Sequence, residues 1–369
     1  MTTRAKLLET VQNLVKTDLR PLVEDIDRKG FYPKEFMLKL GKAGAFACTG
    51  SEAEGGNGLG LSAQIEVIRA VGDECGSTAF SVWCQTACAW YLHQAPNETV
   101  KQRYLSDILN GRVLAGTGMS NTVKHLADIE KNQLQAVKTE GGYTINGILP
   151  WVSNLGEDHI WANTAQIGND YVMFITGGEH QGVSLIDCPE FCGLEGTRTY
   201  AIKFENVFVP NEDVIAQPDQ FAAYIKSIKA GFILLQIGIG AGIIDGCLRE
   251  IAASNAGSVT NCFLDDSYDE LKQRYDDALA LTIKLADDAY ANKPNLLETL
   301  RLREAAAILC LDASRSAALH TGAAGYLMKS PVQRRAREAM FVAVVTPAIK
   351  HLRKEISELE FMGSEEFSI

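Results

Sequence analysis

The sequence lacks the signatures of several common metal and cofactor sites. None of its nine cysteines stands in a C-x-x-C pair and no histidine cluster accompanies them, so we expect Cys84, Cys88, Cys188 and Cys192 to be buried small hydrophobes, not zinc ligands. No G-x-G-x-x-G follows a predicted strand, which argues against a nicotinamide-type dinucleotide site. No G-K-[ST] follows the glycine-rich stretch 50–62, which we interpret as a connecting loop and not as an anion site. With no disulfide framework and no signal-peptide apolar core, a cytoplasmic protein is predicted.

Positive charge is also scarce. Lys and Arg number 35 against 46 Asp and Glu, which gives a formal net charge of -11. A uniform acidic field repels nucleic acid and anionic membrane, so neither is expected as a partner. The most apolar run, residues 232–244, is too short to span a bilayer and is predicted to be a buried helix. The composition, 46% hydrophobic and 22% charged, is typical of a globular protein.

The pattern of apolar residues divides the chain into three parts. Residues 1–112 show the three- and four-residue spacing of helices. Residues 113–216 change to short alternating runs bounded by Gly, Asn and Pro, which are typical of an antiparallel sandwich or barrel. Helical spacing returns in residues 217–369, where Pro347 is expected in the first turn of a final helix. The prediction is therefore an α+β protein with an N-terminal helical domain, a middle antiparallel β domain and a C-terminal helical domain.

Six sequence stretches stand at the joints of these parts. They are YPKEFMLKLGKAGAFA, EGGNGLG and KQRYLSDILNG in the first part, GGYTINGILPWVSNLG and GLEGTRTYAIKFENVFVPNEDVI in the second, and TGAAGYLMKSPVQRRAREAMF in the third. In order and spacing these stretches resemble the acyl-CoA dehydrogenase superfamily. One such match is weak, but six in order cover nearly the whole chain. The resemblance implies an acyl-CoA dehydrogenase-like fold that ends in a four-helix bundle.

The resemblance also implies FAD, bound between the β domain and the C-terminal helices, and a homodimer or homotetramer in which one subunit completes its neighbour's site. A flavin needs an apolar wall beside its ring and donors near its polar atoms. Trp151 matches the family's wall residue, Ser153 the hydroxyl that reaches N5, and Ser120 the one at the pyrimidine edge. The alternative is a core tryptophan and two strand-end serines. The implied FAD-binding set is Met119, Ser120, Trp151, Val152, Ser153, Gly322 and Gly325.

The sequence departs from the family at the catalytic base. The family removes an acidic α-proton with a Glu, while the β-hydrogen leaves as hydride to the flavin. Ungapped alignment places Thr346 at that Glu and Pro347 at the following Gly, and Thr cannot act as a base near pH 7. A minority of the family carries the Glu at the positions of Phe232 or Ile233, which are apolar here. Asp245 is the nearest acidic candidate on that predicted helix, although a helix-surface charge is the simpler interpretation. The catalytic residue is therefore unknown.

Other family features are missing or altered. The motif that supports the partner's FAD pyrophosphate aligns with residues 258–262 and is absent, and Leu319 replaces a Gln, although Gly322, Gly325 and Tyr326 remain. Lys124 and His125 replace a segment that helps hold the thioester, and they are interpreted as a solvated loop face. His320 is the histidine to test first for function. We expect three arginines to lie on a solvated face of a helix: Arg334, Arg335 and Arg337.

Three functions remain open from the sequence. The first is an FAD-dependent oxidoreductase of the acyl-CoA dehydrogenase type, acting on an acyl thioester or a related small molecule. The second is a flavin-dependent monooxygenase of the same fold, which needs no α-proton base. The third is a non-catalytic subunit paired with an active paralogue.

Overall fold

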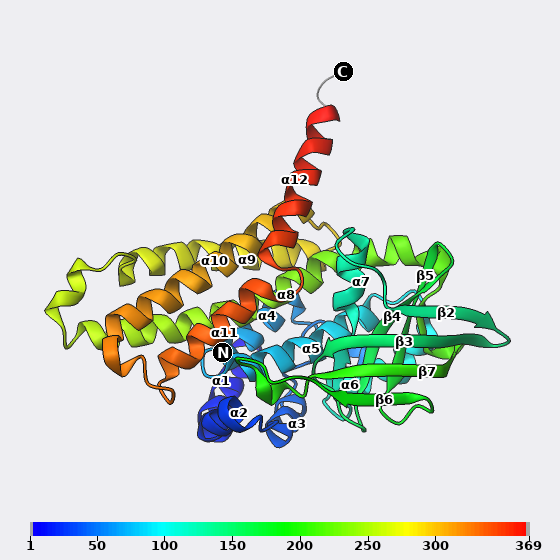
Figure 1. Cartoon of the computed structure of the whole chain (residues 1–369), viewed down its shortest axis with the longest axis horizontal. Coiled ribbons are helices and arrows are strands. Elements are labelled where there is room, and N and C mark those ends of the chain that lie inside the picture. Colours follow the sequence, from blue (N-terminus) through cyan, green and yellow to red (C-terminus); the bar gives the residue numbers. More distant parts are fainter. Residues whose placement is uncertain (1–2, 367–369) are drawn as a thin grey trace.

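The computed structural model of the protein describes residues 3–366 and confirms the helical–β–helical order (Figure 1). The first part consists of helices joined by short π, 3-10 and loop segments. These helices are α1 (Thr3–Leu14), α2 (Val23–Lys29), α3 (Lys34–Lys42), α4 (Gly60–Gly72), α5 (Gly76–His93) and α6 (Glu98–Leu109). Helix α5 carries few charges and is buried from Gly76 to Leu92, so it forms the centre of the molecule.

The middle part is one eight-stranded sheet with a short helix beside it. Its elements are β1 (Ala115–Thr117), α7 (Met119–Leu126), β2 (Leu134–Thr139), β3 (Gly142–Val152), β4 (Ile160–Ile167), β5 (Asp170–Gly177), β6 (Val183–Asp187), β7 (Tyr200–Pro210) and β8 (Val214–Ala216). The strand order is β6-β7-β3-β2-β4-β5-β8, and β1 pairs with β4.

The prediction of an antiparallel β domain is wrong in two strand pairs, and the sheet is mixed. Strand β4 pairs in parallel with both β1 and β2. The hairpin of β2 and β3 returns the chain, so β4 enters on the other side of β2 in the direction of β2. Two parallel neighbours in a sheet need a long connection between them. The alternation of apolar and polar residues does not show such a connection, so the sequence pattern could not predict the parallel pairs.

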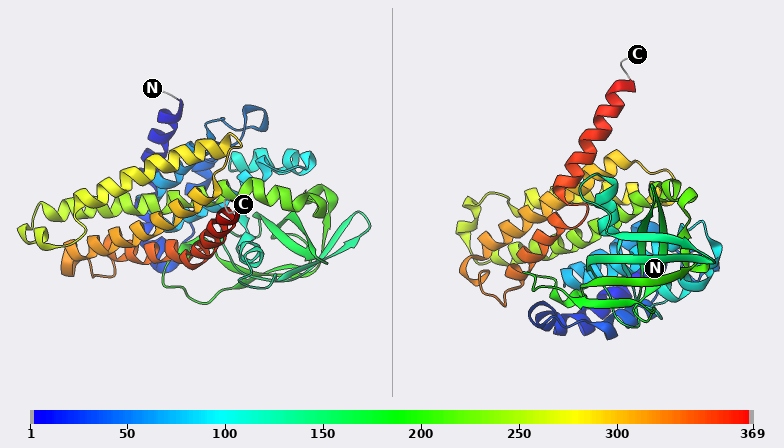
Figure 2. Two further views of the ribbon diagram at one scale, coloured as in Figure 1. Left: turned by 90° about the horizontal axis from the view of Figure 1, so that it is seen from above. Right: turned by 45° about the vertical axis from the view of Figure 1, so that its right-hand side comes forward.

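The third part begins with the long buried helix α8. It is followed by three more packed helices and a last one that projects from the body (Figures 1 and 2). These helices are α8 (Pro218–Asn255), α9 (Tyr268–Tyr290), α10 (Leu296–Thr321), α11 (Pro331–Val344) and α12 (Ile349–Glu366). Pro347 does not lie in the first turn of α12, because the helix begins two residues later.

Helix α8 is the one described helix that is long and apolar enough to cross a membrane. Within its most apolar 18-residue window, 94% is buried inside the protein. It packs against α4, α5, α9 and α10, so its apolar character is accounted for by its place in the core.

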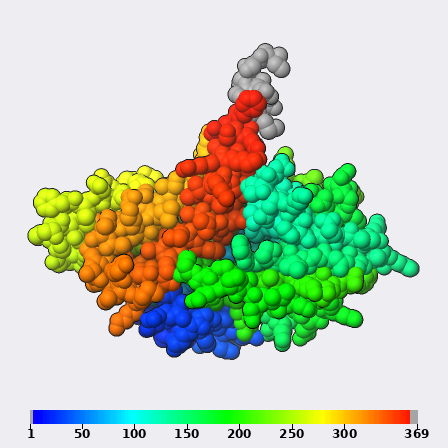
Figure 3. Space-filling view, viewed as in Figure 1, coloured from blue at the N-terminus to red at the C-terminus, as the bar shows by residue number. Residues whose placement is uncertain are grey.

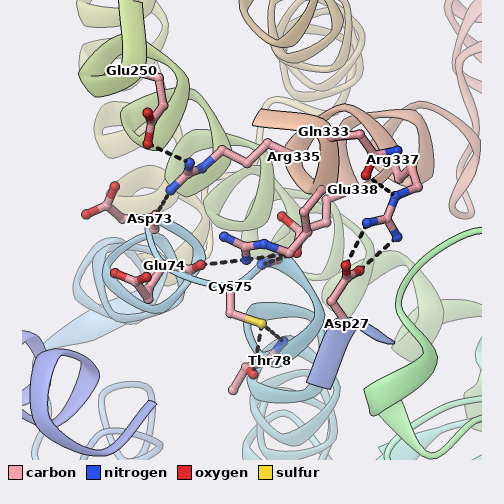
Figure 4. Close-up of polar contacts among 12 residues, drawn as sticks. Asp27, Asp73, Glu74, Cys75, Thr78, Glu250, Gln333, Arg335, Arg337 and Glu338 are labelled. Carbon is pink, nitrogen blue, oxygen red and sulfur yellow. Dashed lines mark hydrogen bonds and ion pairs between the residues drawn. The ribbon is translucent and has the colours of Figure 1, made fainter. Parts of the chain in front are cut away.

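Three arginines of α11 do not form the solvated face that the sequence suggested. Arg334 and Arg335 are buried, with exposed fractions of 5% and 2%. Arg337 donates two hydrogen bonds to the carboxylate of Asp27 on α2, at 2.8 and 2.6 Å (Figure 4). The expectation was wrong because carboxylates and carbonyl oxygens from distant helices surround α11 and satisfy the guanidinium groups.

Small residues make room for this buried group of charges. Arg335 donates to Glu250 on α8 at 3.2 Å, and a Cβ at Gly246 would lie 2.1 Å from its Nε. Glu338 accepts from the amide of Gly76 at 3.0 Å, at the N-terminus of α5 where a carboxylate is favoured. Helix α11 is therefore tied to both the first and the third part of the chain.

The prediction that four of the cysteines are buried is confirmed only in part. Cys84 and Cys88 are buried on α5, whereas Cys188 is half-buried and Cys192 is exposed. The latter two lie in the loop after β6, where the carbonyl of Cys192 accepts from Arg337 of α11 at 3.0 Å. Within residues 3–366, no three His, Cys, Asp or Glu side chains gather as a metal site would require.

Candidate functional site

The end of β3 and the start of α7 meet beside β1, and this contact begins the candidate site. A Cβ at Gly116 in β1 would lie 2.6 Å from the carbonyl oxygen of Ser153, so only glycine allows β1 to approach this closely. Gly118 likewise has no space for a Cβ, which would lie 2.5 Å from Oδ1 of Asn163. These two close approaches place Met119 and Ser120, at the start of α7, near the segment after β3.

Trp151 stands in a bulge of β3 with its side chain largely exposed. The register between β3 and β7 shifts between Leu149 and Val152, which is typical of a bulge that redirects a side chain. The backbone of Trp151 has φ of +56°, a left-handed conformation that is costly for a bulky residue. Its side chain is 62% exposed and has the ring of Phe191 as an edge-on neighbour at 6.4 Å. Such a strained and exposed aromatic is expected where a planar ligand docks.

A chain of hydroxyl groups lies behind Trp151. Ser153 Oγ bonds Thr199 Oγ1 at 2.6 Å, and Thr199 bonds Thr197 at 2.8 Å. Val152, between Trp151 and Ser153, is buried in the core of the sheet. Its role is therefore to anchor the strand end, while its neighbours on either side present an indole and a hydroxyl.

The turn that follows Ser153 is held by contacts with three other residues. The side chain of Asn154 accepts from Tyr32 OH at 2.6 Å and donates to the carbonyl of Ala115 at 2.8 Å. His159 Nδ1 lies 2.9 Å from the carbonyl of Asn154 and its ring is buried. Burial lowers the pKa of His159, so the imidazole is held neutral. The turn after Trp151 is therefore rigidly attached to the first helical part.

Ser120 and Thr346 meet directly. Their hydroxyl oxygens are 2.7 Å apart, although 226 residues separate them in the chain. Gln236 on α8 donates to the carbonyl of Thr346 at 2.8 Å, and buried Arg303 on α10 donates to Gln236 at 3.2 Å. Arg303 also donates to the carbonyl of Val342 at 2.8 Å, near the C-terminus of α11, where a cation is favoured. This buried polar chain sets the position of the turn between α11 and α12.

Burial also affects the guanidinium at the end of this chain. Desolvation lowers the pKa of Arg303 to about 10, which leaves it cationic at neutral pH. A positive charge therefore lies one side chain away from the Thr346 carbonyl.

A cavity of about 100 Å³ opens beside this hydroxyl pair, between α7, α8 and α12. Its deeper end is formed by buried residues, and we call this end the floor. The floor consists of Tyr91, Met119, Phe232, Ile233 and Pro347.

We call the end of the cavity around Lys229 the rim; its residues are partly or fully exposed except for Glu355, which is buried. The rim consists of Leu126, Ile225, Lys229 and Glu355. Ile225 and Ile233 are eight residues apart on one helix, so the cavity extends over about 12 Å at 1.5 Å per residue. Figure 3 shows α12 rising from the surface beside α7, and the rim is formed where these helices meet α8.

Of the two positions that align with the family's base, one lines the floor and the other directly precedes a floor residue, and both are uncharged here. Phe232 and Ile233 line the floor, and Thr346 immediately precedes Pro347. Asp245 is not a replacement, because its carboxylate is paired with Arg69 on α4 at 2.6 and 3.0 Å. Among the described residues that line the cavity, Glu355 is the one carboxylate, and it lies at the rim.

The remaining sequence candidates do not gather at the cavity. Gly322 and Gly325 follow α10, at the end of the helical bundle that points away from the sheet in both views (Figures 1 and 2). His320 is buried there and its Nδ1 lies 2.8 Å from the carbonyl of Ser316, as in a satisfied core histidine. Tyr326 and Leu319 are exposed on the same end.

Lys124 and His125 are engaged within the protein and do not form the solvated loop face that was expected. Lys124 pairs with Glu130 at 2.8 Å. His125 lies 2.8 Å from Tyr171 OH and 3.0 Å from the carbonyl of Glu130. The expectation failed because the segment forms helix α7, which folds this stretch back onto the sheet.

Three functional candidates escaped the sequence reasoning: Gln236, Lys229 and Glu355. Lys229 lies four residues before Ile233 on α8, so helical spacing alone places it on the same face, and this signal was available. Glu355 and Gln236 had no local signal, because each depends on packing between α8 and the last two helices.

The chain is similar in sequence to known acyl-CoA dehydrogenases. The family model described as "Acyl-CoA dehydrogenase, N-terminal domain" matches residues 2–112. The chain is 24% identical over 353 residues to the short-chain-specific acyl-CoA dehydrogenase of Clostridium acetobutylicum, which covers 91% of this chain and 92% of the relative. It is 26% identical over 257 residues to a mitochondrial 2-methylacyl-CoA dehydrogenase of Solanum tuberosum, and this match covers 67% of this chain and 61% of the relative.

The same architecture is found among solved structures. That of butyryl-CoA dehydrogenase from Megasphaera elsdenii superposes with a TM-score of 0.88 at 19% identity, over 98% of this chain and 99% of that one. Glutaryl-coenzyme A dehydrogenase in complex with glutaryl-CoA gives 0.87 at 20% identity, over 98% and 96%. The three-part arrangement is thus the acyl-CoA dehydrogenase fold. Residues 2–112 match this family's N-terminal domain, and the curated relative that matches 91% of the chain is an acyl-CoA dehydrogenase.

Proposed function

We propose that this protein is an FAD-dependent oxidoreductase that acts on an acyl thioester, with a reaction centre that has no carboxylate at its floor. The observation that carries the proposal is the cavity between α7, α8 and α12. Its floor brings together both positions of the family's base, and it lies beside the hydroxyl groups of Ser120 and Thr346. An apolar floor suits an acyl chain, which is held by burial alone.

The residues present fit the ring end of a flavin. Trp151 offers an exposed indole on a strained bulge, and Ser153 and Ser120 offer hydroxyl groups on either side of β1. Ser120 has to exchange its bond to Thr346 for one to the cofactor. Bound FAD supplies the acceptor for the hydride that leaves the β-carbon of the substrate.

Binding the part of FAD that lies away from the flavin ring requires a second copy of the chain. The turn after α10, which contains Gly322 and Gly325, lies at the end of the helical bundle remote from the sheet, so within one chain these glycines do not meet Trp151. A homodimer or homotetramer, in which the bundle end of one subunit reaches the neighbour's flavin, reconciles the two groups of residues. Gly322 has φ of +58° and no atom within 4 Å of a Cβ built on it, so this turn has space for a ligand.

The residues of the chain orient the substrate but supply no strong base. Phe232, Ile233 and Tyr91 exclude water from the acyl group, and Gln236 fixes the Thr346 carbonyl at the floor. The hydroxyl of Thr346 cannot take an α-proton near pH 7. Glu355 is held at the rim by Lys229 and His351, at 2.8 and 3.1 Å from its Oε1, so its carboxylate is already paired and does not take the place of a base at the floor. We therefore expect the wild-type protein to oxidise acyl-CoAs slowly.

The spectrum of the flavin tests the proposal. The purified protein, reconstituted with FAD, is titrated anaerobically with acyl-CoAs of increasing chain length, and the visible absorbance is followed. Slow bleaching by at least one acyl-CoA is expected. Failure to retain FAD would contradict the proposal and favour a non-catalytic subunit. A bound flavin that no thioester bleaches, but that consumes oxygen with a separate reductant, would favour a monooxygenase.

A further inference from the structure

Arg198, just before β7, is a cation for which the structure provides no counter-charge. Its guanidinium packs over the ring of Tyr32, with Cζ 4.9 Å from the ring centroid. Within residues 3–366, no carboxylate lies within ion-pair distance of this guanidinium, and no acceptor takes a hydrogen bond from it. Carboxylates are abundant in the chain, which has a formal net charge of -11. A guanidinium left free among so many carboxylates is available to a negatively charged ligand.

The backbone holds Arg198 in a costly conformation. Its φ is +47°, in the left-handed region that residues other than glycine seldom adopt. The carbonyl of Arg198 accepts from the amide of Leu155 at 3.2 Å, and the amide of Asn154 donates to the carbonyl of Thr197 at 2.9 Å. These two bonds fix the segment around Arg198 against the turn that follows Ser153. Backbone strain of this kind is concentrated at functional sites, where the surrounding structure maintains it.

His159 presents an unpartnered nitrogen to the same turn. Its Nδ1 donates to the carbonyl of Asn154 and the imidazole is neutral, so Nε2 carries no proton and can only accept. Nε2 is buried, and no group among residues 3–366 bonds it. Oδ1 of Asp158 is 3.8 Å away, which is beyond hydrogen-bond distance. A Cβ built on Gly156 would lie 3.2 Å from Nε2 and 3.1 Å from Nη1 of Arg198, so both nitrogens face this glycine.

The two nitrogens together require a ligand with two properties. The ligand must accept hydrogen bonds from a cation, so it is negatively charged, and it must donate one to Nε2, so it carries a proton on oxygen. The other charged groups near His159 are Lys34 and Asp158, which pair with each other at 2.6 Å and balance. Carboxylate, sulfate and nitrate ions accept but cannot donate near pH 7. Hydrogen phosphate and hydrogencarbonate do both.

We propose that Arg198 and His159 bind a small protonated oxyanion beside Gly156, with the guanidinium donating to its oxygens and Nε2 of His159 accepting from its O–H. Inorganic hydrogen phosphate and hydrogencarbonate share this chemistry. The site lies next to the loop between α2 and α3, because Tyr32 of that loop stacks with Arg198. These helices lie at the opposite edge of the molecule from α7 and α12, which border the cavity (Figures 1 and 2). The oxyanion site is therefore separate from the cavity and does not depend on the proposed function.

A direct contact between the two side chains is the competing explanation. If Arg198 rotates and donates to Nε2 of His159, the two groups satisfy each other and no ligand is needed. Anions then do not bind, or they bind through surface charge alone, without regard to a proton on the ion. Two ions of the same shape that differ in that proton therefore separate the explanations.

Isothermal titration calorimetry of the FAD-reconstituted protein, in a phosphate-free buffer at constant ionic strength, provides the test. The probes are two shape-matched pairs: hydrogen phosphate with sulfate, which are tetrahedral, and hydrogencarbonate with nitrate, which are planar. The variants are R198Q and the control R28Q, which removes an exposed positive charge from the neighbouring helix α2. Nitrogen-15 NMR of the histidine-labelled wild type follows Nε2 of His159 during the same titrations, so the test does not depend on the folding of a variant.

We expect the wild type and R28Q to bind one of the protonated ions about tenfold more tightly than its unprotonated partner, and R198Q to lose about tenfold in affinity for that ion, the usual value of a hydrogen bond to a charged group. The Nε2 resonance of His159 should move with that ion and not with its partner. Equal binding of paired ions, unchanged affinity in R198Q, an unmoved Nε2 resonance, or no binding of any of these ions overturns the inference. The tighter of hydrogen phosphate and hydrogencarbonate identifies the ligand.

Discussion

Trp151 shows how a single residue can mark a ligand site before any ligand is seen. A bulky side chain that is buried and well packed can offset a left-handed backbone, but the indole of Trp151 is mostly exposed and offsets little. A bound planar ring would supply the missing contacts. Packing within the chain thus does not account for the strain, and this is consistent with the proposed flavin site.

Replacing Trp151 with alanine should weaken retention of FAD. The substitution removes the aromatic wall and allows water to reach the flavin ring, so the flavin content after gel filtration should fall and the absorbance bands should shift. Phe208→Ala is the matched control, because Phe208 is an exposed aromatic of the neighbouring strand β7, 48% exposed and away from the bulge. Equal flavin content and spectra in both variants and the wild type would contradict the placement.

At the scale of elements, α11 is the part that connects the site to the rest of the fold. Its N-terminal half carries the buried arginines, and its C-terminal half leads to the Thr346 turn, which Arg303 and Gln236 hold. Loosening α11 therefore affects stability and the floor of the cavity together.

The pair of Arg337 and Asp27 provides a test of that connection. Arg337→Met leaves a buried carboxylate without its partner, so the free energy of unfolding should fall by about 3 kcal/mol. The control is Arg301→Met, which breaks the exposed pair with Glu360 and should cost less than about 1 kcal/mol. Denaturant titrations measure both values. Similar losses for the two variants would show that α11 is not held by this pair.

Local patterns predict some of these elements well and others not at all. The helices at 268–290 and 296–321 follow from their spacing, and Ser267 and Asn295 cap them as their residue types suggest. The bulge at Trp151 depends on its pairing with β7, and the Lys229–Glu355 contact joins residues 126 positions apart. Arg334 and Arg335 have the spacing of a surface face, and only the packing of α4, α5 and α8 around them reverses this interpretation. The ring-end positions of the flavin site therefore stay a prediction from the sequence, whereas the rim of the cavity could not be predicted from it.

At the scale of the whole molecule, the candidate site requires all three parts of the chain. Tyr91 comes from the first part, Ser120 and Trp151 from the second, and Gln236 and Thr346 from the third. The contacts between these parts are buried and polar, so their protonation affects the stability of the complete fold.

Acidification from pH 7 to pH 5 should reveal the contribution of His159. Its pKa is lowered in the folded state by burial, while in the unfolded chain it titrates near 6.5. The unfolded state therefore binds more protons in this window, so stability is present above about pH 6.5 and is lost as the pH falls, by at most about 1.4 kcal/mol per pH unit from this group. Chemical denaturation at a series of pH values should show a smaller slope for His159→Gln than for the wild type. Parallel slopes would show that His159 is not held neutral.

The central claim is that the floor of the cavity is a thioester reaction centre without its base. The most direct measurement is the rate of anaerobic flavin bleaching by one acyl-CoA for the wild type, Thr346→Glu and the control Thr346→Gln, which has the same size without the charge. Gln236 holds the backbone of residue 346, so a carboxylate introduced there should face the floor. We predict slow bleaching for the wild type and Thr346→Gln, and a rate about 10²-fold higher for Thr346→Glu, the usual contribution of a general base. Fast bleaching by the wild type that Thr346→Glu reduces would contradict the account, because another carboxylate would then be removing the proton.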